Sequence, residues 1–189
     1  MAIGCVLYSD MYMKTGDNEL AARAAGGDAA AFQVLLERHY DVVYRIAFRF
    51  SGVREDAEDI AQDVCASLVV KLRSFKGDAK FTTWLYRVVV NAVRDMQRKQ
   101  ANAGRINRDY SELQELARGE EADAAKEIAW LYGALDQVGE DLRETAILVL
   151  AESMSHAEAA EILGLKESTI SWRMHELRKK LKTLAEAEL

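Results

Sequence analysis

Hydrophobic residues recur along this chain at intervals of three and four, the spacing of helices with one buried face. The sequence contains no proline, and its β-branched residues lie within helical patterns rather than alternating runs. We therefore predict an all-α fold of two small helical bundles joined by a linker. The expected helices are 17–25, a helix that Asp28 caps and that stops at Ser51-Gly52, 54–72, 81–100, a helix around 128–138, 142–150, and two helices within 155–182.

The helix expected over 81–100 has an apolar stripe and an opposing basic face. Six residues are predicted to pack inward: Phe81, Trp84, Leu85, Val88, Ala92 and Met96. The opposing face carries four polar residues that step by four, three and four: Arg87, Asn91, Arg94 and Arg98. A solvated charged face on a core helix is the simplest interpretation, and contact with a polyanion is the alternative.

Charge is segregated along the chain, although the net charge is only −6. Residues 76–108 are mostly basic, 109–127 are mostly acidic, and 173–182 are basic again. This order suggests two anion-facing modules joined by an acidic linker, predicted at 101–122.

The segment 155–182 has the pattern of a helix-turn-helix, in which the second helix contacts the DNA major groove. Ser155 and Glu158 form a capping box, Gly164 ends the first helix, and a basic helix follows. Its candidate DNA contacts are Ser168, Thr169, Ser171, Trp172, Arg173, His175, Arg178 and Lys179. Two of these residues have alternative interpretations: Trp172 could pack on a neighbouring helix, and His175 could be a polar surface residue without a role in binding. Helical bundles that do not bind DNA share the overall pattern.

The composition excludes several other classes of protein. No apolar run approaches the roughly 20 residues needed to span a bilayer, so we expect no membrane insertion. Cys5 and Cys65 suggest neither a disulfide framework nor a metal site, which fits a reducing cytoplasm. We find no catalytic constellation, no metal set and no phosphate loop, and we expect no cofactor and no enzymatic activity.

Three ordered segments together resemble the bacterial RNA polymerase sigma factors of the small extracytoplasmic-function (ECF) group. "DAEDIAQDVCASLVVKLRSF" resembles the helix that binds core polymerase, and "FTTWLYRVVVNAVRDMQRK" resembles the promoter-melting segment. "SHAEAAEILGLKESTISWRMHELRKKL" resembles the segment that reads the upstream promoter element. The resemblance covers about residues 16–184, and 1–15 are predicted to be an N-terminal extension, with disorder and a start at Met11 or Met13 as open alternatives.

The resemblance implies a role for each surface. Core polymerase would contact Asp56, Asp59, Gln62 and Asp63. The minus-ten element, as duplex and melted strand, would contact Lys76, Lys80, Arg87, Asn91, Arg94 and Arg98. Residues 16–100 would form sigma domain two, and 123–189, with the helix-turn-helix residues above, would form sigma domain four on the minus-thirty-five element.

The resemblance also implies that an anti-sigma factor is a partner of this chain. It implies a location in the bacterial cytoplasm, at the nucleoid when the chain is bound to polymerase. The main alternative is a helix-turn-helix repressor or activator that acts without core polymerase. The chain departs from the family at Val138-Gly139, where Leu-Pro is frequent, and at Trp172 and Glu176, so the upstream DNA sequence cannot be carried over from relatives.

Overall fold

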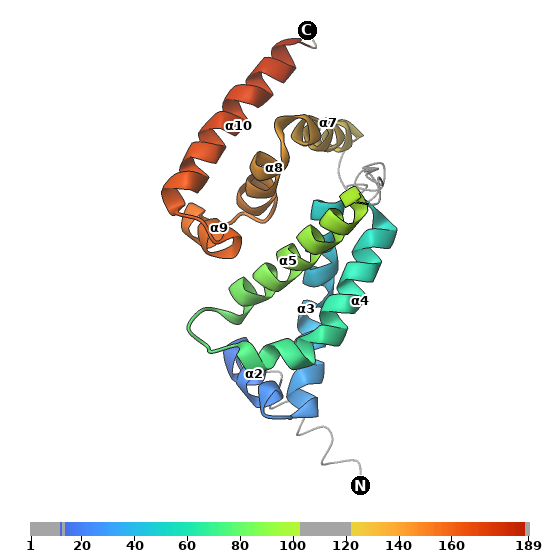
Figure 1. The fold of residues 1–189 in the computed structure, drawn as a ribbon, viewed down its shortest axis with the longest axis vertical. Coiled ribbons are helices and arrows are strands. Elements are labelled where there is room, and N and C mark those ends of the chain that lie inside the picture. Colours follow the sequence, from blue (N-terminus) through green and yellow to red (C-terminus); the bar gives the residue numbers. More distant parts are fainter. Residues whose placement is uncertain (1–11, 13, 103–121, 188–189) are drawn as a thin grey trace. The chain divides into compact units, whose positions relative to one another are not determined.

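The computed structural model describes residues 12, 14–102 and 122–187, and the described part is helical without any strand (Figure 1). The predicted all-α class is therefore confirmed. The described residues divide into two compact units: one lies within 1–47 and 55–98, and the other within 48–54 and 99–189. Most of the predicted linker, at 103–121, and residues 1–11 and 13 of the predicted extension lie outside the described residues. No described helix is long and apolar enough to cross a membrane.

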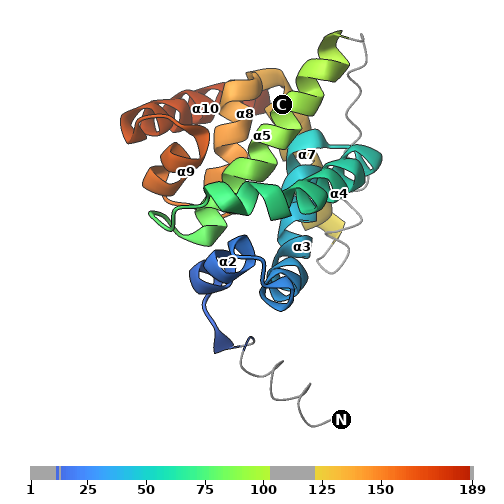
Figure 2. The same ribbon diagram turned by 60° about the horizontal axis from the view of Figure 1, so that its bottom comes forward.

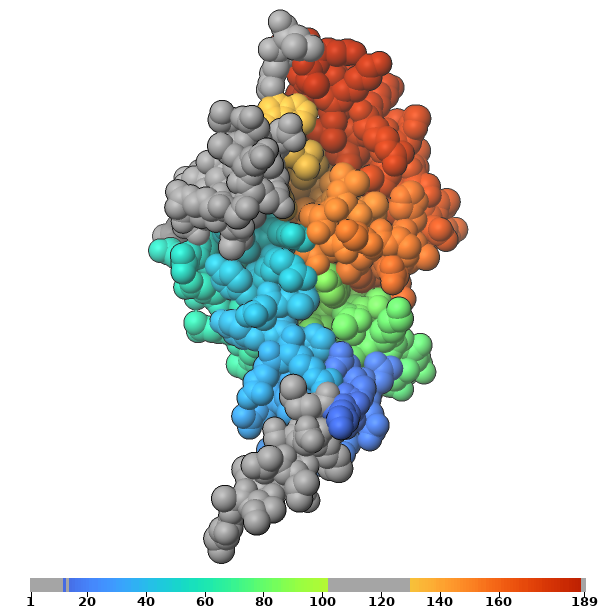
Figure 3. Space-filling view, turned by 180° about the vertical axis from the view of Figure 1, so that it is seen from behind, coloured from blue at the N-terminus to red at the C-terminus, as the bar shows by residue number. Residues whose placement is uncertain are grey.

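Among the described residues from 17 onward, unit 1 contains four helices and one short 3-10 helix. Its elements are α2 (Asp17–Ala25), α3 (Ala29–Ser51), α4 (Arg54–Lys71), η1 (Leu72–Ser74) and α5 (Phe81–Asn102). The last residues of α3, from 48, and of α5, from 99, belong to unit 2. The predicted inward residues of α4 are all buried: Ala57, Ile60, Ala61, Val64 and Leu68, with Leu72 following in η1. Figure 3 shows α2 (blue) directly against α3 (light blue).

The corner between α2 and α3 is held by the carboxylate of Asp28, which caps α3 as predicted. Its Oδ1 accepts hydrogen bonds from the amides of Ala30 and Ala31, both at 3.1 Å. Its Oδ2 accepts from the Tyr12 hydroxyl at 2.9 Å and from Arg23 at 3.1 Å. These bonds, first the one from Ala31 and then the one from Tyr12, hold the pKa of Asp28 below its ordinary value. Tyr12 is buried, so it packs with unit 1 although the sequence analysis assigns it to the extension.

The buried face of α5 is displaced from the predicted stripe. Phe81 and Leu85 are buried as expected, but the others of the stripe, Trp84, Val88, Ala92 and Met96, are only half-buried. The interior residues farther along are instead Tyr86, Val89, Val90 and Val93. A helix packed against more than one neighbour buries a wider face than one stripe, and the positions of those neighbours decide where this face is centred.

Unit 2 contains α7 (Ala122–Val138), α8 (Glu140–Ala146), the π-helical turn η2 (Ile147–Ala151), α9 (His156–Leu163) and α10 (Glu167–Ala187). The capping box of Ser155 and Glu158 is formed, and Gly164 ends α9 in the left-handed conformation, as predicted. Gly139, which caps α8, has a φ of 97°. Proline, whose φ is fixed near −65°, cannot take this conformation, so the chain enters α8 differently from a relative that carries Leu-Pro at this point.

Candidate functional site

The predicted basic face of α5 points outward from unit 1. Arg87, Asn91 and Arg98 are exposed, and Arg94 is half-buried. Arg98 lies along its own helix: it donates to Asp95 at 2.5 Å and to the carbonyl of Arg94 at 3.3 Å. Both contacts are on the exposed surface, where such bonds are weak and exchange readily with an anionic ligand. This face can therefore hold the phosphates of a nucleic-acid strand.

The loop that leads into α5 carries the other two predicted DNA contacts, Lys76 and Lys80, and both are exposed. Three aromatic rings fix the two ends of this loop. The ring of Phe75 lies 5.8 Å from that of Phe81 and 5.4 Å from that of Trp84, and the latter two rings are 5.8 Å apart. Trp84 thus packs in this cluster, as the sequence analysis favoured. Tyr86, on the same helix, is buried in unit 1, so its ring is not exposed for stacking on a base.

The outer face of α4 brings together the residues predicted to bind polymerase. Asp59, Gln62 and Asp63 are exposed, and Asp56 is half-buried. The same face continues toward the end of the helix as an apolar surface that the sequence analysis did not assign. There Val69 is 46% exposed and Val70 63% exposed. Two adjacent valines that continue the side of the helix carrying Gln62 and Asp63 are a signal that the sequence pattern alone could have given.

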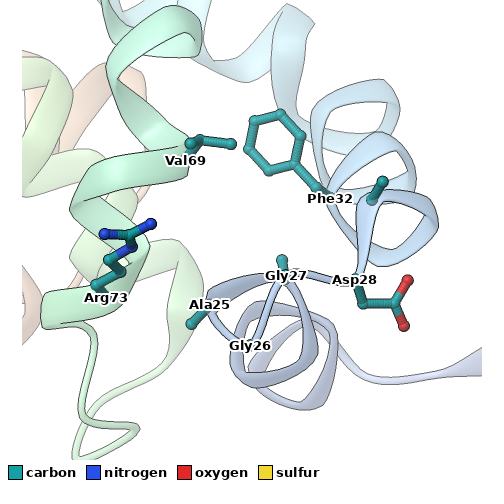
Figure 4. A pocket seen from close by; sticks show the side chains of 9 residues that line it. Ala25, Gly26, Gly27, Asp28, Phe32, Val69 and Arg73 are labelled. Carbon is teal, nitrogen blue, oxygen red and sulfur yellow. The ribbon is translucent and has the colours of Figure 1, made fainter.

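A hollow of about 410 Å³ lies beside this apolar end of α4 (Figure 4). Val69 and Arg73 border it on one side, and Phe32 and the turn between α2 and α3 border it on the other. The hollow is thus separate from the basic face of α5, and its lining is mainly apolar.

The helix-turn-helix of unit 2 presents most of its predicted contacts on the outer face of α10. Exposed or half-exposed are Ser168, Thr169, Ser171, Trp172, His175, Arg178 and Lys179. Trp172 is 59% exposed, so it does not pack on a neighbouring helix within the described structure. Ser171 Oγ lies 3.0 Å from His156 Nδ1, which joins the first turn of α9 to the second turn of α10. Hydroxyls, a tryptophan and cations on one helical face are suited to bind DNA.

Arg173 is predicted to contact DNA, but the structure places its side chain inside unit 2. It is only 9% exposed, and its guanidinium points at α8. There it pairs with the Asp141 carboxylate at 3.0 Å and donates to the Asp141 carbonyl at 3.2 Å. Lys180 similarly donates to the carbonyl of Val138, at the end of α7, at 2.9 Å. Both cations therefore attach α10 to its own unit, and Arg173 is not available to DNA in this structure.

The remaining titratable groups among the described residues include one cysteine, Cys65. Burial raises the pKa of the half-buried Cys65 thiol, which makes it a poor nucleophile. Within residues 12, 14–102 and 122–187, no group of three or more His, Cys, Asp or Glu side chains is arranged to hold a metal ion.

Comparison with known sequences gives matches over most of the chain. Residues 35–103 match the sigma-70 region 2 family. RNA polymerase sigma factor NccH of Alcaligenes xylosoxydans xylosoxydans is 32% identical, over 90% of this chain and 95% of that protein. ECF RNA polymerase sigma factor SigM of Mycobacterium tuberculosis is 33% identical, over 89% of this chain and 84% of that protein.

Solved structures agree with these matches. CnrH, solved in complex with the cytosolic domain of CnrY, superimposes with a TM-score of 0.67 at 30% identity and covers 92% of this chain and 99% of that chain. The sigma factor RpoE of Bartonella quintana, solved with the anti-sigma factor NepR, has a TM-score of 0.63 at 22% identity, over 84% of this chain and 98% of that chain. The second likeness supports the fold alone.

Proposed function

The chain belongs to the ECF family of RNA polymerase sigma factors, and we propose that its two units divide the work of promoter recognition between them. It binds core RNA polymerase, directs the enzyme to specific promoters and helps to melt promoter DNA. The observation that carries this conclusion is the match to sigma factors along almost the whole chain, unit 1 and unit 2 together. A repressor or activator that acts without polymerase would account for the helix-turn-helix only.

The polymerase contact is assigned to the outer face of α4. Asp59, Gln62 and Asp63 form an acidic and amide surface for a basic partner, and Asp56 lies one turn earlier. Val69 and Val70 extend the same face with exposed apolar surface that a protein partner could bury. The charged residues in the first half of the face would orient the chain on polymerase, and the two valines would add buried apolar area to the interface.

The minus-ten element is assigned to α5 and the loop before it, within a sigma domain two of residues 16–100. Promoter opening requires a base to leave the duplex stack, which costs a few kcal/mol. Arg87, Arg94 and Arg98 would hold the strand through its phosphates, as Lys76 and Lys80 would from the loop. Asn91 lies among them on the same face, and its amide can donate to and accept from the edge of an unstacked base.

The minus-thirty-five element is assigned to α10, within a sigma domain four of residues 123–189. The contacts are the predicted set without Arg173, since that side chain is buried against α8. The residues 101–122 would connect the two domains as an acidic linker. Because the net charge of the chain is −6, duplex binding by the isolated protein should be weak, and recognition would wait for the core enzyme. Tight, sequence-specific duplex binding by the chain alone would contradict this.

Regulation by an anti-sigma factor is part of the proposal. CnrH, 30% identical to this chain, has been solved with a cytosolic domain of a second protein bound to it. We expect an equivalent partner that keeps the chain from core polymerase, and we place the chain in the bacterial cytoplasm, at the nucleoid when bound to polymerase. Deletion of the neighbouring regulatory genes should then raise transcription of the target promoters; unchanged transcription would remove the anti-sigma factor from the proposal.

Run-off transcription with purified bacterial core polymerase on a genomic fragment library tests the function directly. Core enzyme with this chain should produce RNA from specific start sites that core enzyme alone does not use. A variant with Asp59→Arg and Asp63→Arg should fold normally and lose this activity, because two carboxylates of the α4 face become cations. Promoter binding by the chain with no gain from core polymerase would support a repressor or activator instead.

A further inference from the structure

The loop before α5 is tied to the first helix of the fold by one side chain, that of Asn18. Its Oδ1 accepts a hydrogen bond from the amide of Phe81 at 2.7 Å, and its Nδ2 donates to the carbonyl of Ala79 at 3.1 Å. Asn18 lies in the first turn of α2, 63 residues before Phe81. Figures 1 and 2 both show α2 beside this loop.

The two bonds enclose a single residue of the loop. Ala79 precedes Lys80 and Phe81 follows it, so the backbone is held on both sides of Lys80 by the same amide group. The bond to Phe81 also satisfies one of the amides that a helix start leaves without an intrahelical partner. Asn18 thus caps α5 from outside its own segment, at the point where the basic loop becomes the basic helix.

The anchor itself is rigid, because the neighbouring residue ties α2 to α3. The carboxylate of Asp17 accepts from Arg38 at 2.8 Å, and its other oxygen lies 2.9 Å from His39 Nε2. The ring of His39 in turn lies 5.2 Å from that of Phe81. Asp17 and Asn18 therefore connect the loop to the buried centre of unit 1 through a continuous set of contacts.

We propose that Asn18 is a positioning residue for promoter melting: it fixes the loop around Lys80 in the conformation that receives the unpaired minus-ten strand. The inference rests on the proposed function of α5. A loop with several accessible conformations must be ordered when the strand binds, and that ordering lowers both the affinity and the ability to distinguish bases. A loop already held by two hydrogen bonds avoids this loss.

The test uses holoenzyme made from core polymerase and the full chain as wild type, Asn18→Ala, Asn18→Asp or Glu19→Ala. The Ala variant loses both bonds, whereas the Asp variant keeps an acceptor for the Phe81 amide and loses the donor to Ala79. Glu19 is an exposed neighbour in the same turn and is the matched control. A fluorescent base in the minus-ten element reports the rate of opening, and single-stranded minus-ten oligonucleotides with single-base changes report base discrimination.

We expect Asn18→Ala to slow opening by about five- to tenfold, because it loses two hydrogen bonds that each contribute modestly at a partly exposed position. Discrimination among the oligonucleotides should fall as well, Asn18→Asp should recover part of both losses, and Glu19→Ala should match wild type. Binding to the duplex minus-thirty-five element should not change in any variant.

Two results would overturn the inference while leaving the proposed function intact. One is an active wild type with an Asn18→Ala variant that opens promoters at the same rate with the same discrimination. The other is an equal loss for every oligonucleotide with no recovery in Asn18→Asp, which would indicate a general loss of stability. A wild-type holoenzyme that does not open any promoter would overturn the proposed function, and this inference with it.

Discussion

Two basic helices, α5 in unit 1 and α10 in unit 2, differ in how far their arginine side chains are exposed. On α5, Arg87 and Arg98 lie on the face opposite the core and are exposed. On α10, Arg178 is exposed, but Arg173 is buried and bound to Asp141 of α8. Both helices would look alike in a count of cations, yet only one arginine of the pair on α10 faces solvent.

The difference arises from the position of each arginine relative to the buried stripe of its helix. Arg173 immediately precedes the buried Met174 and follows the buried Ile170 by three residues, so it lies at the border of the core. A long arginine at such a border can extend inward when an acceptor is present, and the carbonyl and carboxylate of Asp141 provide one. Whether a cation on such a helix faces solvent or binds within its own unit therefore depends on the neighbouring helix.

Substitution of Arg173 should give the largest effect on stability. Arg173→Ala removes a buried side chain and its contacts between α10 and α8, so we expect a loss of about 1–3 kcal/mol of unfolding free energy. Arg178→Ala, on the exposed side of the same helix, should change stability by less than about 0.5 kcal/mol. Urea unfolding of the two variants measures both values. Equal stability of the two variants would contradict the structural role of Arg173.

Arg87→Ala should show the opposite behaviour on α5. Its side chain is exposed, so the stability of the chain should not change, but holoenzyme should bind all promoters more weakly. Loss of one phosphate contact should also reduce the slope of log affinity against log salt by about one. Binding measured at several salt concentrations provides the slope. An unchanged slope would remove Arg87 from the DNA-binding face.

Asn91→Ala should give a smaller and more selective effect than Arg87→Ala. An amide that reads one base edge contributes at a single position, so the preference there should fall by about fivefold, the worth of one hydrogen bond of roughly 1 kcal/mol. Opening rates on promoters with each minus-ten base changed in turn measure this preference. Equal losses for every base would show that Asn91 does not read sequence.

Acid should weaken unit 1 through Asp28, and this is the smallest expected effect. Because the folded pKa of Asp28 is lowered, its contribution is present above the ordinary aspartate pKa of about 3.9 and is lost as pH falls through the lower folded value. Asp28→Asn keeps a capping oxygen without the charge. Thermal unfolding of wild type and Asp28→Asn between neutral and strongly acidic pH should show a difference that disappears in acid. A constant difference would mean that the charge does not contribute.

Local signals in the sequence were sufficient for the ends of most helices. The predicted bounds of α2 agree with the structure, α3 begins after its Asp28 cap and ends at Ser51, and α9 has its capping box and its glycine end. These features depend on residues within one turn of each other, so neighbouring sequence contains the whole cause. The π-helical turn at Ile147–Ala151, by contrast, had no signal in the sequence analysis.

The order of basic and apolar residues along the chain determined the helices, the outward faces of α4, α5 and α10, and the resemblance to ECF sigma factors. Tertiary structure decided which arginine of α10 is buried, where the core face of α5 is centred, and that Asn18 reaches the loop at Lys80. The physical reason is distance along the chain. A helical face is set by residues three and four apart, whereas a hydrogen bond over 63 residues depends on how separate helices pack.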